Sequence, residues 1–174
     1  STCVLFGDGA GAAVVSPADD SGRGILDTFL KADGRLTELL RMRGGGTAVK
    51  PEVAVEEGLN AIEMNGQEVF KAAVTAMGDS AQLILERNGL TGDDLKYLIP
   101  HQANVRIINA TARRVKLDPE KVYVNVNEYG NTSAASIPIA MTEAKDKGLI
   151  EPGDLLLLVA FGGGFTWGSA LIRY

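Results

Sequence analysis

The second half of the chain alternates short apolar runs with helical stretches, and this alternation restricts the fold more than any other feature of the sequence. Apolar runs at Leu95–Pro100, Val122–Val126 and Leu155–Phe161 have the length of buried strands. Between and after them, Asn104–Lys116 and Ser133–Lys147 have the spacing of helices. Strands that alternate with helices predict a layered α/β domain.

Further apolar runs predict antiparallel strands at the two ends of this pattern. The chain closes with Ser169–Tyr174, which reads as a strand after a glycine turn. Near the start, Val4–Phe6 and Ala12–Val15 flank a glycine-rich stretch, which predicts a turn between paired strands, with Ile25–Leu30 pairing next.

The middle of the chain predicts a surface loop followed by two helices. Arg35–Pro51 is polar and contains Gly44-Gly45-Gly46, so we expect an exposed loop that carries Arg41 and Arg43. From Val53 to Asn88, apolar residues recur at helical spacing, and two helices joined near Asn65-Gly66 account for the pattern.

Composition and residue counts exclude several classes of protein. The net charge of −5 argues against nonspecific nucleic-acid binding, and no apolar run approaches the roughly 18 residues of a membrane-spanning helix. A single cysteine, Cys3, and a single histidine leave no internal disulfide and no Cys/His zinc cluster. We therefore expect a cytoplasmic protein with no bound metal, no nucleic-acid partner and no membrane segment.

The start of the chain lacks the features of two kinds of N-terminal motif. It has neither the charged region nor the cleavage site of a signal peptide and opens directly into strand-like sequence, so we expect that it begins inside a longer protein. Gly7-Asp8-Gly9-Ala10-Gly11 lacks dinucleotide-loop spacing, and strand-like Ala12–Val15 follows where a helix should begin, which argues against nucleotide binding there.

Polar groups follow three of the predicted strands. His101 comes directly after Leu95–Pro100, and Asn131 lies in the loop after the next predicted strand. A glycine-rich loop containing Gly163 follows Leu155–Phe161 and offers backbone N–H groups that no side chain shields. Because open α/β sheets place such loops around one crevice, we expect a single site that stabilises an enolate or oxyanion.

Each of these features has a simpler interpretation when it is considered alone. His101 would then be a structural residue that caps the following helix, and Asn131 would be a turn or N-cap residue. The glycines around Gly163 would serve only a tight β-turn. The functional interpretation depends on the three loops lying together.

Four longer motifs stand out along the chain, namely Phe6-Gly7-Asp8-Gly9-Ala10-Gly11-Ala12-Ala13, His101-Gln102-Ala103-Asn104, Gly130-Asn131-Thr132-Ser133-Ala134-Ala135-Ser136 and Phe161-Gly162-Gly163-Gly164-Phe165-Thr166-Trp167-Gly168-Ser169-Ala170. Through these motifs the chain resembles a known family, the β-ketoacyl-acyl-carrier-protein synthase III enzymes of the thiolase superfamily. The similarity extends over nearly all 174 residues.

The resemblance implies the C-terminal half of a thiolase-like fold, with a mixed five-stranded sheet packed between helices and residues 1–174 as one domain. It implies a Cys-His-Asn triad in which His101 and Asn131 belong to this chain, while the nucleophilic cysteine belongs to an absent N-terminal half. Gly163 is implied as an oxyanion-hole residue, and Asn104 and Phe161 as substrate-binding residues. Cys3 has no flanking motif of the family, so we expect it to be a buried structural thiol.

The resemblance also implies a reaction and partners. A short acyl group, such as acetyl, would pass from coenzyme A to the cysteine and condense with malonyl-acyl carrier protein in a decarboxylative Claisen reaction that initiates fatty acid synthesis. Coenzyme A thioester is a substrate there, and no cofactor is implied. The enzyme would be a homodimer, and this half alone would be inactive.

Residues that this chain lacks disfavour other branches of the superfamily. Elongating ketosynthases use two histidines from this half, and thiolases use a second cysteine near the C-terminus. Two alternatives remain. One is a related synthase of secondary metabolism that makes quinolones, polyketides or long-chain ketones. The other is a noncatalytic module that binds coenzyme A or a carrier protein.

A basic helix suggests an acidic partner. Between Asn104 and Leu117 the chain has four basic residues and no acidic one, although its net charge is negative. A stripe of Val105, Ile108, Ala112 and Val115 would face inward and leave arginines outside. The resemblance implies that these arginines and a lysine on the preceding helix dock acyl carrier protein, whereas the pattern alone fits a solvated face equally well. The docking residues so implied are Lys71, Arg106, Arg113 and Arg114.

Overall fold

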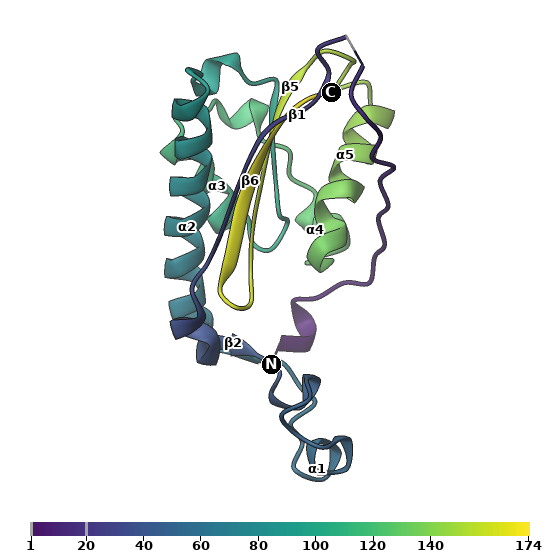
Figure 1. The fold of residues 1–174 in the computed structure, drawn as a ribbon, viewed down its shortest axis with the longest axis vertical. Helices are drawn as coiled ribbons and strands as arrows, with labels where there is room; N and C mark the ends of the chain where they lie inside the picture. The colour runs from purple at the N-terminus through teal and green to yellow at the C-terminus, as the bar shows by residue number, and fades with distance from the viewer. Residues whose placement is uncertain (1, 20) are drawn as a thin grey trace.

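A mixed sheet of four strands organises the computed structural model, which describes residues 2–19 and 21–174 (Figure 1). The strand order is β1–β6–β5–β4, with β4 and β5 parallel and the other two pairs antiparallel. The strands are β1 (Gly24–Ala32), β4 (Tyr97–Pro100), β5 (Leu155–Gly162) and β6 (Thr166–Arg173). A separate small pair is formed by β2 (Leu40–Arg41) and β3 (Glu63–Met64).

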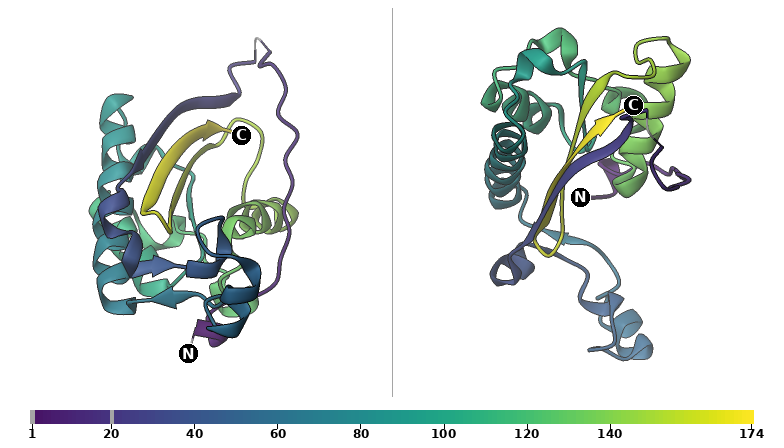
Figure 2. Two further views of the ribbon diagram at one scale, coloured as in Figure 1. Left: turned by 60° about the horizontal axis from the view of Figure 1, so that its bottom comes forward. Right: turned by 45° about the horizontal axis from the view of Figure 1, so that its top comes forward.

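Helices cover the sheet from both sides. The long helix α2 (Gly66–Arg87) and α3 (Val105–Arg114) lie together on one side, and α5 (Ser136–Asp146) lies on the other (Figures 1 and 2). The short helices are α1 (Pro51–Glu56) and α4 (Val126–Tyr129). Turns of 3₁₀-helix lie at Thr2–Val4, Gly34–Leu39, Arg43–Gly45, Gly92–Asp94, Pro119–Lys121 and Ser133–Ala135.

Alternation along β5 explains why the sheet has a core on each side. Leu155, Leu157 and Val159 are buried against α2, whereas Leu156 is buried on the opposite face with Ile99 of β4 and the inner side of α5. Successive side chains of a strand point to opposite faces, so a strand covered on both sides must be apolar throughout. The predicted α/β layering is confirmed.

The predicted fifth strand is wrong in the described part of the chain. Val122 makes only an isolated parallel bridge to Leu98, and the chain then enters α4. The side chain of Gln102 explains this, because its Nε2 donates to the carbonyl of Tyr123 at 3.1 Å and its Oε1 accepts from the N–H of Asn125 at 3.0 Å. Those backbone groups are therefore not available to extend a strand.

The predicted hairpin near the start is also wrong, because its glycines serve a close approach. The segment passes along the loop before α5, and a Cβ at Gly7 would lie 2.0 Å from the carbonyl oxygen of Tyr129. At Gly11 it would lie 2.3 Å from the ring of Pro138. The run Ala12–Val15 pairs with no described residue, and β1 pairs with the last strand instead.

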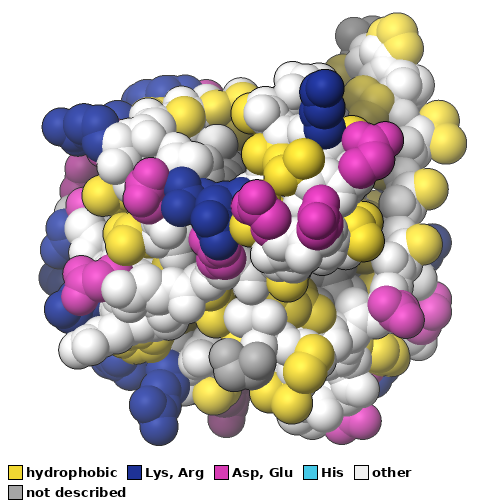
Figure 3. All heavy atoms as spheres, turned by 90° about the horizontal axis from the view of Figure 1, so that it is seen from below, with side chains coloured by type: hydrophobic (Ala, Val, Ile, Leu, Met, Phe, Trp, Pro, Cys, Tyr) yellow, Lys and Arg dark blue, Asp and Glu magenta, His cyan; other side chains and the backbone are white. Residues whose placement is uncertain are grey.

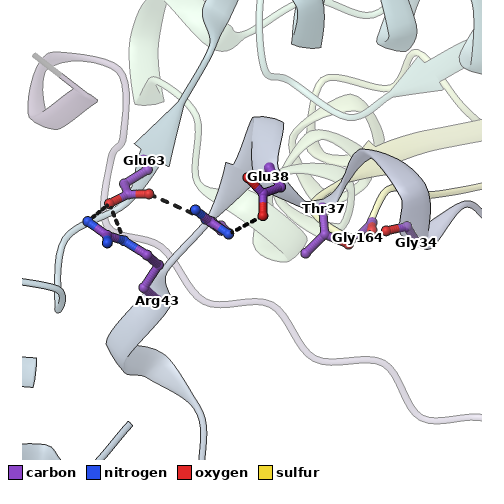
Figure 4. A network of polar contacts seen from close by, with 7 residues as sticks. Gly34, Thr37, Glu38, Arg43, Glu63 and Gly164 are labelled. Atoms are coloured by element: carbon purple, nitrogen blue, oxygen red, sulfur yellow. Dashed lines mark hydrogen bonds and ion pairs between the residues drawn. The ribbon is translucent and has the colours of Figure 1, made fainter. Parts of the chain in front are cut away.

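The segment before α2 is less helical than its periodicity predicts. Only α1 forms in the first part, and α2 begins at Gly66, where the Oδ1 of Asn65 accepts a hydrogen bond from the N–H of Glu68. The preceding loop is held by ion pairs from Arg41 and Arg43 to Glu63, so the two arginines expected on an exposed loop are engaged (Figure 4).

One face of the sheet is only partly covered. Phe29 pairs with Ser169, whose hydroxyl reaches α2, so the neighbouring Leu30 points to the opposite face, where α5 lies. The contacts of α5 are with β4 and β5, and Leu30 remains 83% exposed with Ile25 at 59%. Apolar surface is therefore open beside α5. In the described residues no helix is both long and apolar enough to span a membrane.

Candidate active site

An open cleft of about 1620 Å³ lies at the carboxyl ends of β4 and β5. Its polar wall includes His101 after β4 and Asn131 before α5, and Gly163 lies at the tip of the β5–β6 hairpin. The three loops that the sequence predicts at one site thus lie around one cleft. Of the other predicted residues, Asn104, Arg106 and Phe161 line it as well. Apolar side chains from the sheet, α2 and α3 form much of the rest, including Leu30, Met64, Phe70, Met77 and Ile107.

His101 is held at both its backbone and its ring. Its N–H donates to the carbonyl of Val159 on β5 at 2.8 Å, which continues the β4–β5 ladder. Its ring Nδ1 lies 2.7 Å from the hydroxyl of Ser136, the first residue of α5. Burial lowers the pKa of His101 below its usual value of 6.5, so the imidazole is neutral at pH 7.

Among residues 2–19 and 21–174, the side-chain amide nitrogen of Asn131 has no hydrogen-bond partner. Its backbone is paired with the N-terminal segment, with its N–H bonded to Leu5 and its carbonyl to Gly7, each at 3.0 Å. Its Oδ1 accepts from the N–H of Ser133 at 2.9 Å, which is the turn role considered for it. Since the oxygen is engaged, the NH₂ group is the part that can donate to a ligand.

Gly163 lies in a hairpin turn that is held by hydrogen bonds to the segment after β1. Phe165 exchanges backbone hydrogen bonds with Asp33 at 2.8 and 2.9 Å, and the Thr37 hydroxyl lies 2.8 Å from the Gly164 carbonyl (Figure 4). A Cβ at Gly163 would come within 3.3 Å of the carbonyl oxygen of Leu40. Within the described ranges the N–H of Gly163 has no hydrogen-bond acceptor, so it is available to bind an oxyanion.

The two predicted substrate-binding residues differ in exposure. Asn104 is exposed and is the N-cap of α3, where its Oδ1 accepts from the N–H of Arg106 at 2.8 Å. The capping role considered for His101 thus belongs to Asn104. Phe161 is 9% exposed and stacks at a tilt on Phe165, with ring centroids 4.8 Å apart, so it stiffens the wall of the cleft.

The predicted docking cations fall into two groups. Lys71 pairs with Glu68 at 2.8 Å, and Arg114 pairs with Asp79 at 2.9 Å, which joins α3 to α2. By contrast, Arg106 and Arg113 are exposed and form no ion pair within residues 2–19 and 21–174. Lys and Arg side chains are visible along the α2–α3 side of the molecule, interspersed with acidic ones (Figure 3).

Two predictions about individual side chains are wrong. Val105, expected on the inner stripe of α3, is 47% exposed, and Ile107 is buried in its place, because the stripe is rotated by part of a turn. Cys3, expected to be a buried thiol in a strand, is exposed in a 3₁₀ turn. Among the described side chains, no group of His, Cys, Asp and Glu could hold a metal ion.

The motifs contain two polar residues whose contribution sequence reasoning missed. Gln102 and Ser136 are 1% and 2% exposed, and both form hydrogen bonds next to His101. Gln102 ties the end of β4 to the segment before α4, and Ser136 contacts the ring of His101. The position of Gln102 directly after His101 in the motif is only a weak sign of such a role, because burial is not visible in the sequence.

Comparison with family models and known proteins shows what the chain resembles. Residues 85–174 match the family model described as 3-oxoacyl-[acyl-carrier-protein] synthase III C terminal, and residues 1–34 match that described as 3-oxoacyl-[acyl-carrier-protein] synthase III. All of the chain aligns at 54% identity with a β-ketoacyl-[acyl-carrier-protein] synthase III of Caldanaerobacter subterraneus subsp. tengcongensis, of which it covers 53%. A protein of the same description from Clostridioides difficile is 48% identical, with the same coverage of both chains.

Solved structures show the same similarity at the level of the fold. The crystal structure of 3-oxoacyl-[acyl-carrier-protein] synthase III from Aquifex aeolicus superposes with a TM-score of 0.88 at 47% identity, covering 99% of this chain and 51% of that one. The priming β-ketosynthase of the R1128 polyketide pathway superposes with a TM-score of 0.83 at 35% identity, again over 99% of this chain and 51% of its own length. This chain therefore spans about half the length of the proteins it matches.

Proposed function

The chain belongs to the 3-oxoacyl-[acyl-carrier-protein] synthase III family, and from this premise we propose that it is the C-terminal half of a thiolase-fold condensing enzyme. The reaction we propose joins a short acyl group from coenzyme A to malonyl-acyl carrier protein by decarboxylative Claisen condensation. Fatty acid synthesis begins with such a step. His101 and Asn131 are the catalytic residues of this chain, and the nucleophilic cysteine comes from the N-terminal half.

One observation carries the proposal, namely that the cleft presents two hydrogen-bond donors without a charge. His101 is kept neutral by burial, and the oxygen of Asn131 is occupied, so that the imidazole and the amide NH₂ both offer N–H groups. Neutral donors in a cleft lined mostly by apolar side chains suit a reaction in which negative charge develops on a carbonyl oxygen. Such donors are less suited to a reaction that begins when a carboxylate of the enzyme removes a proton from the substrate.

The decarboxylation step follows from these donors. The bond between the malonyl carboxylate and its methylene carbon breaks, carbon dioxide leaves, and the electron pair moves onto the thioester as an enolate. The developing charge lies on the thioester oxygen, where N–H groups of His101 and Asn131 would stabilise it. No proton has to leave the donors, so neither residue changes its protonation state in this step.

Carbon–carbon bond formation needs a second group of donors. The enolate carbon attacks the carbonyl of the acyl-cysteine, the carbonyl oxygen takes the negative charge, and the charge returns as the cysteine thiolate departs. The backbone N–H of Gly163, which has no acceptor within the described residues, is our candidate for this oxyanion. Asn104 at the mouth of the cleft and Phe161 in its wall are the proposed contacts to the substrate arm.

We assign the open sheet face beside α5 to the N-terminal half. The chain covers 53% of the first relatives, and the exposed Leu30 lies on the rim of the cleft. A second half packed there would bury apolar surface and bring its cysteine to His101 and Asn131. We also propose that the complete enzyme is a cytoplasmic homodimer and that residues 1–174 alone are inactive.

Acyl carrier protein is the proposed partner of the basic helix. Arg106 lines the cleft and is not ion-paired in the described structure, and Arg113 lies two turns further along α3 with the same freedom. Unpaired cations next to the substrate entrance attract an acidic carrier at little desolvation cost. Arg114 and Lys71 contribute less, since each already has an acidic neighbour.

A second candidate function keeps the chemistry and changes the pathway. The priming β-ketosynthase of polyketide synthesis that superposes on this chain is 35% identical to it. The same donors and cleft would serve a starter unit for secondary metabolism. The two candidates differ in the acyl-coenzyme A that the complete enzyme prefers.

The test uses the complete protein with purified malonyl-acyl carrier protein and acetyl-coenzyme A. We expect release of carbon dioxide from labelled malonyl groups and formation of a 3-oxoacyl product, and both should be lost in the His101→Ala variant. Acetyl labelling of the protein should persist in that variant. Labelling without any condensation by the wild-type protein would refute the proposed condensation, and loss of both reactions in the wild-type protein would leave a noncatalytic binding module.

A further inference from the structure

Ser136 contacts the proposed catalytic histidine on the Nδ1 side of its ring and lies in the lining of the same cleft. It is the first residue of α5, and its side chain is buried with 2% exposure. The Oγ lies 2.7 Å from Nδ1 of His101 and 3.2 Å from the backbone nitrogen of Gln102. The hydroxyl therefore lies between one fixed donor, the Gln102 N–H, and one ring nitrogen whose proton is not determined by geometry alone.

Counting protons resolves which tautomer fits. The Gln102 N–H can only donate, so it occupies one lone pair of the hydroxyl. If Nδ1 also donated to Oγ, the hydroxyl proton would have no acceptor within hydrogen-bonding distance in the described structure, which is costly for a buried group. If the hydroxyl donates to Nδ1, all three groups are satisfied.

We propose that Ser136 is a positioning residue that holds neutral His101 in the tautomer with its proton on Nε2. With Nδ1 occupied as an acceptor, Nε2–H is the group that the ring can offer to a ligand in the cleft. This inference rests on the proposed function in one respect, since that function requires His101 to donate. It adds a residue at Nδ1 that selects the donating nitrogen.

The surroundings leave the hydroxyl as the main determinant of the ring. The charged residues that line the same cleft are Lys31 on β1, Arg41 on β2 and Arg106 on α3, and all three are cations. Neither α5, β4 nor β5 contributes a charged side chain to that lining. Among the described residues no carboxylate orients the imidazole, unlike the arrangement in many catalytic histidines.

The direct test observes the tautomer by nitrogen NMR in the complete protein. Histidine is labelled with ¹⁵N, and the His101 signals are identified by their loss in the His101→Ala variant. Above the ring pKa, we expect the wild-type protein to show an unprotonated Nδ1 and a protonated Nε2. In Ser136→Ala the two tautomers should mix, and in Ser136→Thr, which keeps the hydroxyl, the wild-type pattern should remain.

A matched control separates this effect from loss of a buried hydroxyl in general. Ser80 on α2 is 1% exposed, its hydroxyl bonds to the Met77 carbonyl, and it lies outside the cleft. Ser80→Ala therefore removes the same atom at the same burial and should leave the His101 signals unchanged. If Ser136→Ala fails to fold, Ser136→Cys keeps the size with a weaker donor and should give an intermediate mixture.

Kinetics give the second measurement. Removing the partner of a catalytic imidazole should lower condensation on the order of 10- to 100-fold and spare acetyl transfer from coenzyme A. An unchanged tautomer in Ser136→Ala, or a wild-type ring with its proton on Nδ1, overturns the inference whatever the activity. A wild-type protein with the expected tautomer but without condensation overturns the proposed function instead.

Discussion

At the scale of single residues, the amide of Asn131 combines an observed turn role with the chemical role that we propose for it. Its oxygen accepts from the N–H of Ser133, so a substitution that removes only the NH₂ group leaves the turn acceptor in place. This makes Asn131→Asp an informative change. Alanine would remove both functions together.

We expect Asn131→Asp to lower condensation by about 10²-fold or more, because a donor is replaced by a charged acceptor facing the enolate. Acetyl transfer from coenzyme A to the protein should fall much less. Measuring both half-reactions with the complete enzyme checks this. Equal losses in the two would contradict the assigned role of the NH₂ group.

The pH dependence of condensation should report the state of His101. Burial lowers the pKa of its ring, so the neutral donor persists below the usual value of 6.5 and is lost only as the pH falls through the lowered pKa. Condensation should therefore decline on the acid side at a pH below 6.5. Rate profiles of the wild-type enzyme and of His101→Ala check this, and an acid limb that survives in the variant with high activity would assign the proton to another group.

At the scale of elements, the proposed docking surface on α3 contains two neighbouring arginines with different surroundings. Arg113 is exposed without an ion pair in the described structure, whereas Arg114 bridges to Asp79 on α2. Reversing the charge of Arg113 should therefore weaken binding of an acidic partner without disturbing the fold. Reversing the charge of Arg114 would in addition place an acidic side chain next to Asp79.

Arg113→Glu should raise KM for malonyl-acyl carrier protein and leave acetyl transfer from coenzyme A unchanged, and added salt should reduce the difference by screening. Kinetics at two ionic strengths check this, with Lys145→Glu on the opposite helix α5 as the control for net charge. Impairment of both half-reactions in a normally folded variant would argue against docking at α3.

The elements themselves were predictable where local pattern and tertiary structure agree. β5 and α3 appear at their predicted positions, because an apolar run and a helical stripe each require the burial that the sheet provides. The run Val122–Val126 does not form the predicted strand, and the reason lies in the tertiary structure. The side chain of Gln102 forms hydrogen bonds with backbone groups of this run that a strand would need.

The site was predictable to a similar extent. The loops after β4 and β5 bring His101 and Gly163 to one cleft, because these strands are parallel neighbours in the sheet. Asn131 reaches the same cleft from the loop between α4 and α5, although the strand predicted before it does not form. Ser136 was not predictable, because its contact with the histidine ring joins residues 35 positions apart. Only the position of α5 against β4 creates that contact.

At the scale of the whole molecule, we expect residues 1–174 alone to lack acyl transfer and to associate through the open sheet face. Residues 1–174 should acquire no acetyl label from labelled acetyl-coenzyme A, since the proposed nucleophile lies outside them. Adding the N-terminal half should restore stoichiometric labelling on that half. Mass spectrometry of the labelled peptides checks this, and stoichiometric acetylation of Cys3 in the chain alone would place the nucleophile here.

The same face should control association. Leu30→Glu places a charge on the exposed sheet surface, so the isolated chain should self-associate less, and complementation by the N-terminal half should weaken. Val55→Glu on α1 is the control, since Val55 is also exposed but lies outside the cleft and the sheet. Sedimentation and complementation assays check both, and equal effects of the two changes would contradict an interface on the sheet.

The close passage of the N-terminal segment along the loop before α5 has a consequence for sequence divergence. Gly7, Gly9 and Gly11 each face a neighbour within 3 Å of where a Cβ would stand, whereas Asp8 and Ala10 between them are exposed. Substitution tolerance should therefore alternate with a period of two along these five positions. In a saturation library of the complete enzyme selected for condensation, the odd positions should retain glycine while the even ones accept other residues. Such a pattern would show from sequences alone that this segment packs closely against the loop that carries Asn131.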